Sequence, residues 1–286
     1  MLGRRGSLRF LAVPPFAWLI VLFVAPLLLA ILISFRAERG PIDFGSLLQA
    51  STVQYEKIVG TPSWLRLLAT SAGMALLVAA LATLFAFPIA YFLAFRARHR
   101  APIFLILLLV PAATSFLLRV MAWKVLLGGS GAINSFLIWI GVIQDPIGLL
   151  LYSQAAVVIT LIYVWIPFAA LPIYAALQRV DRSHLEAAAD LGAGPWSRFW
   201  RVTVALSLPG VLATLFMVFI PTVGEYVTPF LVGGTDGFMY GLLIQDFFSR
   251  AGNWPLGSAL AVIMLLVTVA LVAVALRVVD LRRAVA

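Results

Sequence analysis

The sequence has no cysteine, only two histidines and no nucleotide-binding motif, and each absence excludes a class of chemistry. Without cysteine the chain can form neither a disulfide nor a thiolate metal site. His99 and His184 both lie among arginines, and no cluster of His, Asp and Glu has metal-ligand spacing. Because the sequence has no Walker motif, the chain cannot bind and hydrolyse ATP through a P-loop. No nucleophile–base pair is evident either, so we expect a protein that is not an enzyme.

Charge is also scarce. Charged residues make up 11% of the 286 residues, less than half of the roughly 25% typical of soluble domains. Hydrophobic residues make up 63%, and the mean hydropathy is +1.09. This composition fits a bilayer better than water. The net charge of +9 is explained by arginines at cytoplasmic loop ends, and no basic stretch lies outside the apolar framework, so we expect no nucleic-acid partner.

Six apolar segments reach the length of about 20 residues that a membrane-spanning helix needs. They predict an all-α integral membrane protein with one membrane domain over residues 1–286. The predicted spans are 12–35, 66–95, 102–127, 151–178, 205–232 and 257–278. The first segment is too long for a signal peptide core, and we interpret it as a retained helix that its prolines kink. The connecting loops are expected at 36–65, 96–101, 128–150, 179–204 and 233–256.

The distribution of Lys and Arg predicts the orientation. If the N-terminus is inside, 13 of the 20 basic residues lie in inside segments, while the outer loops hold several acids. Positive residues favour the cytoplasmic side of a membrane. Both termini and the loop at 179–204 are therefore expected in the cytoplasm. No internal repeat is evident, which disfavours secondary transporters that are built from inverted repeats.

The cytoplasmic loop at 179–204 contains a short polar helix. Asp181, Arg182 and Ser183 can cap its start. Gly192 would end it, and Gly194-Pro195 would prevent its extension. Small alanines beside an acid let such a helix lie in a groove of another protein, with Glu186 facing basic or amide groups there. The alternative is an ordinary amphipathic loop helix.

The stretch EAAADLGAGPWSRFWRVTVALSLP, residues 186–209, resembles the EAA loop of the permease subunits of ABC importers, which docks on the ATPase subunit. The similarity extends over about residues 10–280. The segments VWIPFAALPIYAALQRVDRSHLEAAADLGA, GEYVTPFLVGG and NWPLGSALA resemble the polyamine-type permeases, and the order of segments suits the spermidine/putrescine B-type group. One departure concerns the helix after the loop, because many EAA loops have proline where this chain has Ala205, and here proline follows at Pro209.

The resemblance implies a type I ABC importer permease fold with a cytoplasmic coupling helix, in the bacterial inner membrane. It implies coupling to the ATPase through Glu186, Ala187, Ala188, Asp190, Leu191 and Gly192. The implied partners are a second homologous permease, two ATPase subunits, a periplasmic solute-binding protein and the lipid bilayer. ATP and Mg would be bound by the ATPases, so this chain needs no cofactor. The implied function is polyamine import by alternating access.

Two alternatives stay open at this point. The same machine could carry another solute, such as an amino-acid derivative, sulfate or iron. An ion-coupled secondary transporter would need intramembrane carboxylates as ion sites, and Glu225 is the one plausible candidate.

The candidate residues for the substrate path are one carboxylate and several aromatics. Glu225 could attract a cation, it could form a structural pair with Arg119 or Lys124, or it could already lie in the outer membrane interface. These two basic residues lie five apart and point roughly 140° apart on a helix, so they cannot share one narrow pore. The ring faces that could line a cation path belong to Trp123, Tyr163, Trp165 and Tyr226. We interpret Trp254-Pro255 as a membrane-interface or binding-protein contact.

Overall fold

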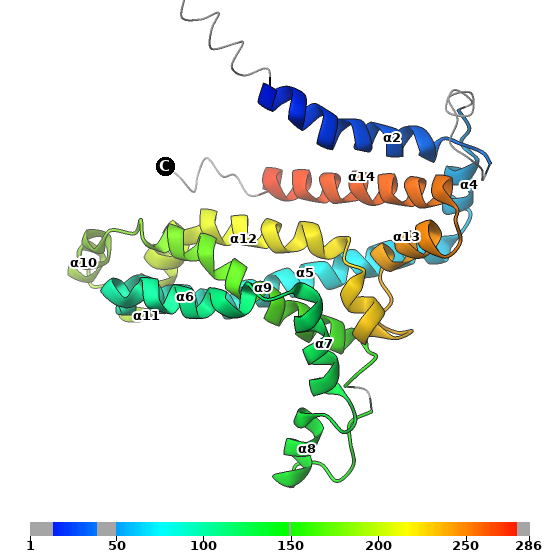
Figure 1. Cartoon of the computed structure of the whole chain (residues 1–286). Coiled ribbons are helices and arrows are strands. Elements are labelled where there is room, and N and C mark those ends of the chain that lie inside the picture. Colours follow the sequence, from blue (N-terminus) through cyan, green and yellow to red (C-terminus); the bar gives the residue numbers. More distant parts are fainter. Residues whose placement is uncertain (1–13, 39–49, 149, 279–286) are drawn as a thin grey trace, which may run out of the picture. The chain divides into compact units, whose positions relative to one another are not determined.

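The computed structural model describes residues 14–38, 50–148 and 150–278, and within them the regular structure is entirely helical (Figure 1). The chain divides into two compact units, Met1–Leu65 with Ile244–Val267, and Arg66–Leu243 with Thr268–Ala286. The expectation of a single membrane domain stays a prediction.

The helices at the predicted spans are α2 (Ala25–Ser34), α5 (Pro62–Tyr91), α6 (Ala101–Ala112), α7 (Phe116–Leu127), α9 (Gln154–Leu177), α12 (Ala205–Val223) and α14 (Trp254–Val278). The helices in the predicted loops are α4 (Val53–Val59), α8 (Ala132–Trp139), α10 (Arg182–Asp190), α11 (Pro195–Arg198) and α13 (Tyr240–Ser249). Short π- or 3-10-helical turns are η1 (Ile20–Val24), η2 (Phe92–Ala97), η3 (Arg98–Arg100), η4 (Phe199–Val204) and η5 (Pro229–Gly233).

Six helical stretches of the described chain are long and apolar enough to cross a membrane. They are Pro14–Ser34, Pro62–Ala112, Phe116–Trp139, Gln154–Leu177, Pro195–Val223 and Trp254–Arg277. The predicted all-α fold with six apolar helices is confirmed. Most of the first predicted span, 12–35, is helical from Pro14 onward, and its π-helical turn η1 ends at Val24, two residues before Pro26. Residues 12–13 lie outside the described part.

The predicted third span at 102–127 is wrong as a single helix. The chain leaves helical geometry at 113–115, between α6 and α7. Pro111 lacks the N–H that the helix needs, the hydroxyl of Thr114 donates to the Pro111 carbonyl over 2.7 Å, and Ser115 is extended, with ψ 133°. As a result α7 runs in a different direction from α6 (Figure 1).

Besides the loop at 179–204, where a short helix is predicted, three predicted loops contain helices, so their description as loops was incomplete. The clearest case is 128–150, where α8 follows Gly131. Asn134, which is fully buried, donates from Nδ2 to the Gly128 carbonyl over 3.0 Å and accepts at Oδ1 from the Ile147 N–H over 2.9 Å. This one side chain joins the two ends of the loop around α8. The loops at 36–65 and 233–256 likewise hold α4 and α13.

The predicted fifth span at 205–232 is displaced towards the N-terminus. The helical run begins at Pro195 and passes through Ala205 without interruption. The helix after the EAA-like loop therefore starts at Pro195, ten residues before Ala205. It ends at Val223, ahead of Gly224, and the chain then forms the separate turn η5. The segment from Gly224 to Pro229 therefore interrupts the helix that the sequence predicts over 205–232.

The core of the second unit is the packing of α9 on α12. The Thr214 hydroxyl shares its proton between two carbonyl oxygens, that of Ala169 on α9 at 3.2 Å and that of Gly210 on α12 itself at 2.9 Å. Gly210 has no room for a side chain, because a Cβ there would lie 2.7 Å from the Pro172 oxygen and against Ala176. Small residues thus bring two apolar helices into close contact, as is common inside membranes.

In the first unit, α4 is tied to the end of α2. Gln54, which is buried, donates from Nε2 to the carbonyls of Arg36 and Ala37 over 3.1 and 3.0 Å. The hydroxyls of Ser34 and Tyr55 are 2.6 Å apart. The Gln54 bonds satisfy the carbonyl groups of two residues that follow α2, where the chain is no longer helical.

Candidate functional site

The predicted coupling helix exists as α10, with the expected start and end. The Asp181 side chain accepts from the Ser183 N–H over 3.0 Å and caps the start. The helix ends at Asp190, and Gly192 follows with φ +80°. Its N–H donates to Ala189 over 2.8 Å, so the turn closes on the last helical carbonyls. A residue with positive φ at this place is the usual reason for glycine after a helix.

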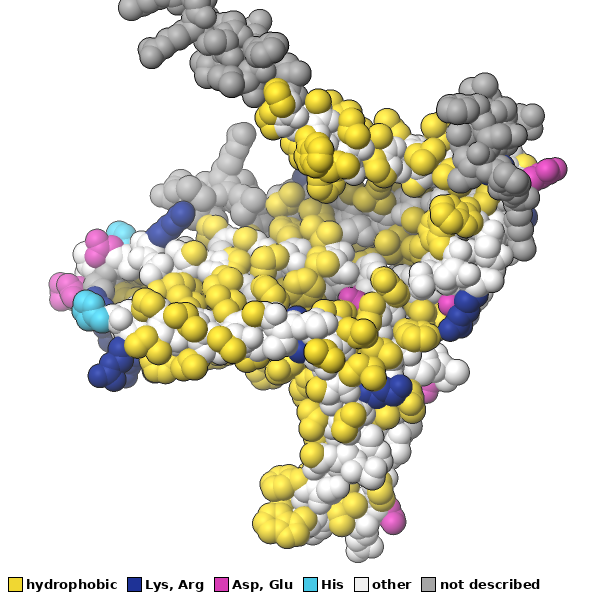
Figure 2. Space-filling model, viewed as in Figure 1, with side chains coloured by type: hydrophobic (Ala, Val, Ile, Leu, Met, Phe, Trp, Pro, Cys, Tyr) yellow, Lys and Arg dark blue, Asp and Glu magenta, His cyan; other side chains and the backbone are white. Residues whose placement is uncertain are grey.

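The outward face of α10 is acidic and small. Glu186, Ala187 and Asp190 are exposed, and Ala188 is half-buried. Leu191, directly after the helix, is 88% exposed. Figure 2 shows acidic, basic and histidine side chains gathered at the end of the second unit that carries α10. A polar surface with one highly exposed leucine favours contact with another protein over contact with lipid tails.

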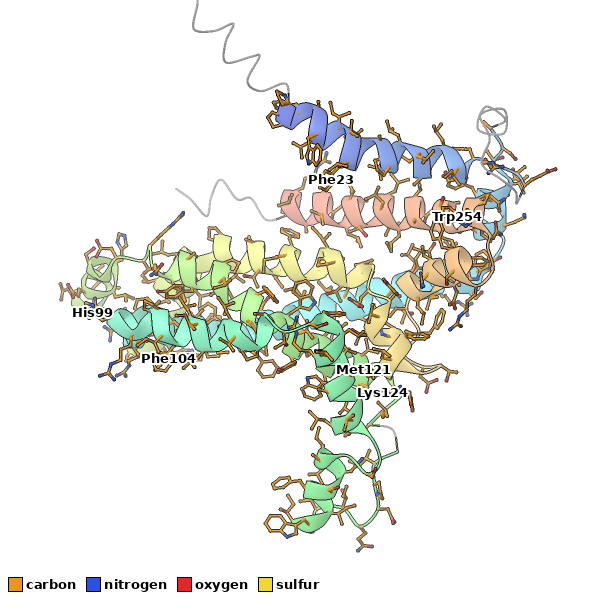
Figure 3. All side chains as sticks on the ribbon, in the orientation of Figure 1. Phe23, His99, Phe104, Met121, Lys124 and Trp254 are labelled. Carbon is orange, nitrogen blue, oxygen red and sulfur yellow. The ribbon has the colours of Figure 1, made fainter. Side chains whose placement is uncertain are left out.

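The return from α10 towards α12 is anchored by aromatic rings. Phe199 in η4 lies 5.8 Å from Phe87 and 5.9 Å from Tyr91, measured between ring centroids. Trp196 stacks on Phe199 at 6.0 Å while 73% of its own surface stays exposed. The basic turn that follows Tyr91 therefore belongs to the same end of the unit, where Figure 3 labels His99.

A hollow of about 500 Å³ lies between the end of α10 and the start of the next helical run; we call it the α10 hollow. Its lining residues are Ala188, Leu191, Gly192, Ala193, Gly194, Ser197, Arg198, Arg201 and Val202. Sequence reasoning used Arg198 and Arg201 for the orientation alone and missed their place here. Their spacing of three residues on a helix, which puts both side chains on one face, could have indicated it.

Two of the predicted path residues lie together. The rings of Trp123 on α7 and Tyr163 on α9 are 5.4 Å apart. They line a hollow of about 330 Å³, and Tyr163 also lines a neighbouring one of about 180 Å³. Arg119 lines both hollows, and its Nη1 lies 3.5 Å from the Val164 carbonyl.

The side chains of Arg119 and Lys124 contact different groups, as their angular separation on the helix predicts. The ammonium of Lys124 lies 5.7 Å from the centre of the Tyr152 ring, in cation–π range. Figure 3 labels Lys124 and Met121 on α7, far from the end of the unit that carries α10. Within the described chain neither basic residue forms an ion pair with Glu225. The alternative of a structural pair for Glu225 is therefore not seen.

The remaining path candidates are not brought into the same hollows. Trp165 lies 6.1 Å from Phe168, ring to ring, and its buried indole nitrogen has no hydrogen-bond partner within the described part of the chain. Glu225 is half-buried and its Oε1 accepts from the N–H groups of Val227 and Thr228, over 2.8 and 3.2 Å. Tyr226 is 45% exposed. Glu225 thus caps the turn that leads into η5.

These features define a class: a helical, multi-pass membrane protein with a polar loop presented between two tightly packed helices. Residues 86–285 match the family described as the binding-protein-dependent transport system inner membrane component, and the chain belongs to this family. The predicted type I ABC importer permease fold is confirmed, and the chain is a multi-pass protein of the inner membrane.

Individual relatives cover most of the chain. It is 32% identical over 250 residues to the spermidine/putrescine transport system permease protein PotB of Escherichia coli, covering 87% of this chain and 90% of that protein. It is also 32% identical over 247 residues to PotB of Haemophilus influenzae, with 86% and 85% covered. Among solved structures, a chain of a bacterial alginate ABC transporter in complex with an alginate-bound periplasmic protein superposes with a TM-score of 0.73 at 15% identity, covering 95% of this chain and 93% of that one. This last likeness concerns the fold alone.

Proposed function

We propose that this chain forms the path and the coupling element of an importer that moves polyamine-like cations from the periplasm to the cytoplasm. The observation that carries the proposal is the similarity to the PotB proteins over 87% of the chain, which includes the α10 loop. The proposed assembly contains a second homologous permease, two ATPase subunits that bind ATP and Mg, and a periplasmic solute-binding protein. Both termini and α10 face the cytoplasm in this proposal.

The coupling step follows from the position of α10. The helix α9 enters the loop and α12 leaves it, and these two helices are packed on each other through Gly210 and Thr214. A displacement of α10 by the closing ATPases would therefore shift α9 and α12 together instead of bending a loose loop. Their movement opens the path to the outside and then to the inside. Glu186 and Asp190, one helical turn apart and exposed, present the charge that the ATPase meets.

The substrate path is proposed along the aromatic side of the hollow that Trp123 and Tyr163 line. Arg119 lines the same hollow and would repel a cation, so we propose that the solute meets the two rings and not the guanidinium. Aromatic faces attract ammonium groups by about 0.5–2 kcal/mol each and do not hold them permanently. Such weak attraction suits a path, because a solute must also leave it. Glu225, Tyr226 and Trp165 stay proposed as further path residues, although they do not line this hollow.

The coupling role is tested by charge reversal on α10 in the assembled importer. Glu186→Lys reverses the charge presented to the ATPase, so we expect the permease to insert normally but to retain less ATPase on purification. Asp236→Lys is the matched control, because Asp236 is equally exposed but lies in a predicted outer loop. Equal ATPase retention in both variants would remove α10 from the coupling role.

The solute is tested separately, by uptake into proteoliposomes that contain the complete importer and its binding protein. We expect labelled spermidine or putrescine to accumulate with ATP, and sulfate, iron and amino-acid derivatives not to accumulate. ATP-dependent uptake of one of these other solutes alone would keep the importer and replace the substrate. Uptake driven by an ion gradient without ATP would overturn the importer itself.

A further inference from the structure

The α10 hollow contains positive charge for which the described chain supplies no counter-ion. Arg198 and Arg201 both line it, and Ser197 adds a hydroxyl. The exposed acids of the loop, Glu186 and Asp190, form no ion pair with either arginine. The hollow is therefore a basic recess directly behind an acidic helix.

Arg198 is the more constrained of the two arginines. Its Nε is buried and has no hydrogen-bond partner among the described residues. The same side chain also lines a second hollow of about 240 Å³, beside Tyr91, Leu185 and Phe199. Arg198 as a whole is half-buried, so its Nε is enclosed while the residue borders both hollows. A buried donor without an acceptor is costly, and an arginine in this situation is usually paired.

The geometry restricts what can fill the recess. Ala188, Leu191 and Gly192 belong to the coupling segment and form one wall of the α10 hollow. A group that fills the hollow therefore contacts the coupling segment at the polar tip of the unit. The opposite wall belongs to α11 and η4, which continue into the apolar helix α12. This position favours a protein side chain over a lipid headgroup. The charge requires that this side chain carry a carboxylate, which matches the planar, forked guanidinium.

We propose that the α10 hollow receives an Asp or Glu side chain of the partner ATPase, with Arg198 as its counter-ion and Arg201 at the rim. The proposal rests on the proposed coupling function and deepens it. The coupling loop then acts in both directions: α10 enters the ATPase, and an ATPase side chain enters the loop behind α10. Contact from two sides lets the ATPase pull the loop as well as push it.

The test uses the scarcity of lysine in this chain. Lysine occurs at Lys57 and Lys124 only, both in segments predicted on the outer side. Arg198→Lys keeps the positive charge and places a primary amine in the hollow. In the complete importer, a zero-length carbodiimide should join this amine to a carboxylate as an amide, with loss of water. We expect a permease–ATPase adduct that peptide mass spectrometry maps from residue 198 to an ATPase Asp or Glu.

The matched control is Arg100→Lys, an exposed arginine in η3 at the same end of the unit and outside the hollow. We expect about tenfold less adduct from it, because its carboxylate contacts would be transient. In parallel, Arg198→Gln should lower solute-stimulated ATP hydrolysis about tenfold or more, since it strands a buried carboxylate of the partner. Absence of an adduct from Arg198→Lys in an intact complex, or equal adduct from both lysine variants, overturns the proposal.

Three further outcomes are distinguishable. If Arg198→Gln retains full stimulated hydrolysis but loses a co-purifying anionic phospholipid, the recess is a lipid site and the proposal is wrong. If Glu186→Lys releases the ATPase while Arg198→Lys gives no adduct, the coupling function stands and only this inference fails. If Glu186→Lys leaves the ATPase bound, the coupling function itself fails.

Discussion

The hydroxyl of Thr214 on α12 donates a hydrogen bond to the carbonyl oxygen of Ala169 on α9 across 3.2 Å. This bond crosses the helix pair that flanks the coupling loop. One turn away, Gly210 allows the two backbones to approach where any side chain would collide with Pro172. The pair is therefore held by close packing and one shared hydrogen bond, and a force on the loop acts on both helices.

The close approach at Gly210 predicts a stability effect. Gly210→Val would place new atoms against the Pro172 oxygen and Ala176, and overpacking of this kind costs about 1–3 kcal/mol. We expect a lower yield of folded protein and a lower unfolding temperature in detergent. The control is Gly73→Val in α5, where a Cβ meets nothing within 4 Å. Equal unfolding temperatures for the two variants would contradict the packing argument.

Orientation can be measured with single cysteines, because the parent chain has none. Leu191→Cys and Trp139→Cys place thiols at side chains that are 88% and 81% exposed. With a membrane-impermeant maleimide on intact cells whose outer membrane is permeabilised, we expect labelling at position 139 only. In inverted vesicles the pattern should reverse. Labelling of position 191 from outside would refute the predicted cytoplasmic loop.

For Glu225 the structure separates two roles that the sequence could not. Its carboxylate caps a turn by accepting from Val227 and Thr228. The second role, attraction of a cation from outside the hollow that Trp123 and Tyr163 line, is the one that we propose. Glu225→Gln keeps an acceptor oxygen and removes the charge, so we expect normal yield of complex and weaker uptake of polyamine. Glu225→Ala also removes the cap, worth about 1 kcal/mol, and should lower the yield. Unchanged uptake in the Gln variant would leave Glu225 with the capping role alone.

The sequence predicted the features that depend on local composition. Apolar length located the helices, and Asp181 and Gly192 predicted both ends of α10, because caps are read from single residues. It also predicted that Arg119 and Lys124 diverge, since this follows from helix geometry alone.

The sequence did not predict what depends on tertiary packing. The break after Ala112 was hidden because Pro111 lies in an apolar run that satisfies the length criterion for a span. The place of Arg198 in the α10 hollow was hidden for a different reason. Its surroundings come from α5, α10 and η4 together, and no local pattern indicates which neighbours a half-buried arginine will have.

The central claim, that the α10 loop couples this permease to ATP hydrolysis, is tested most directly at the glycine that ends the helix. Gly192 has φ +80°, a conformation that a β-branched residue rarely adopts, while Gly129, in the predicted outer loop 128–150 and outside the α10 hollow, has no such positive φ. A Cβ at either position meets nothing within 4 Å, so the two substitutions differ in backbone strain and not in steric clash.

The decisive measurement is uptake of solute and solute-stimulated ATP hydrolysis in the same proteoliposomes containing the complete importer. The account predicts that Gly192→Val inserts and assembles but loses both activities together, while Gly129→Val retains both. If Gly192→Val imports solute and stimulates hydrolysis as well as the parent protein does, the α10 loop is not the coupling element.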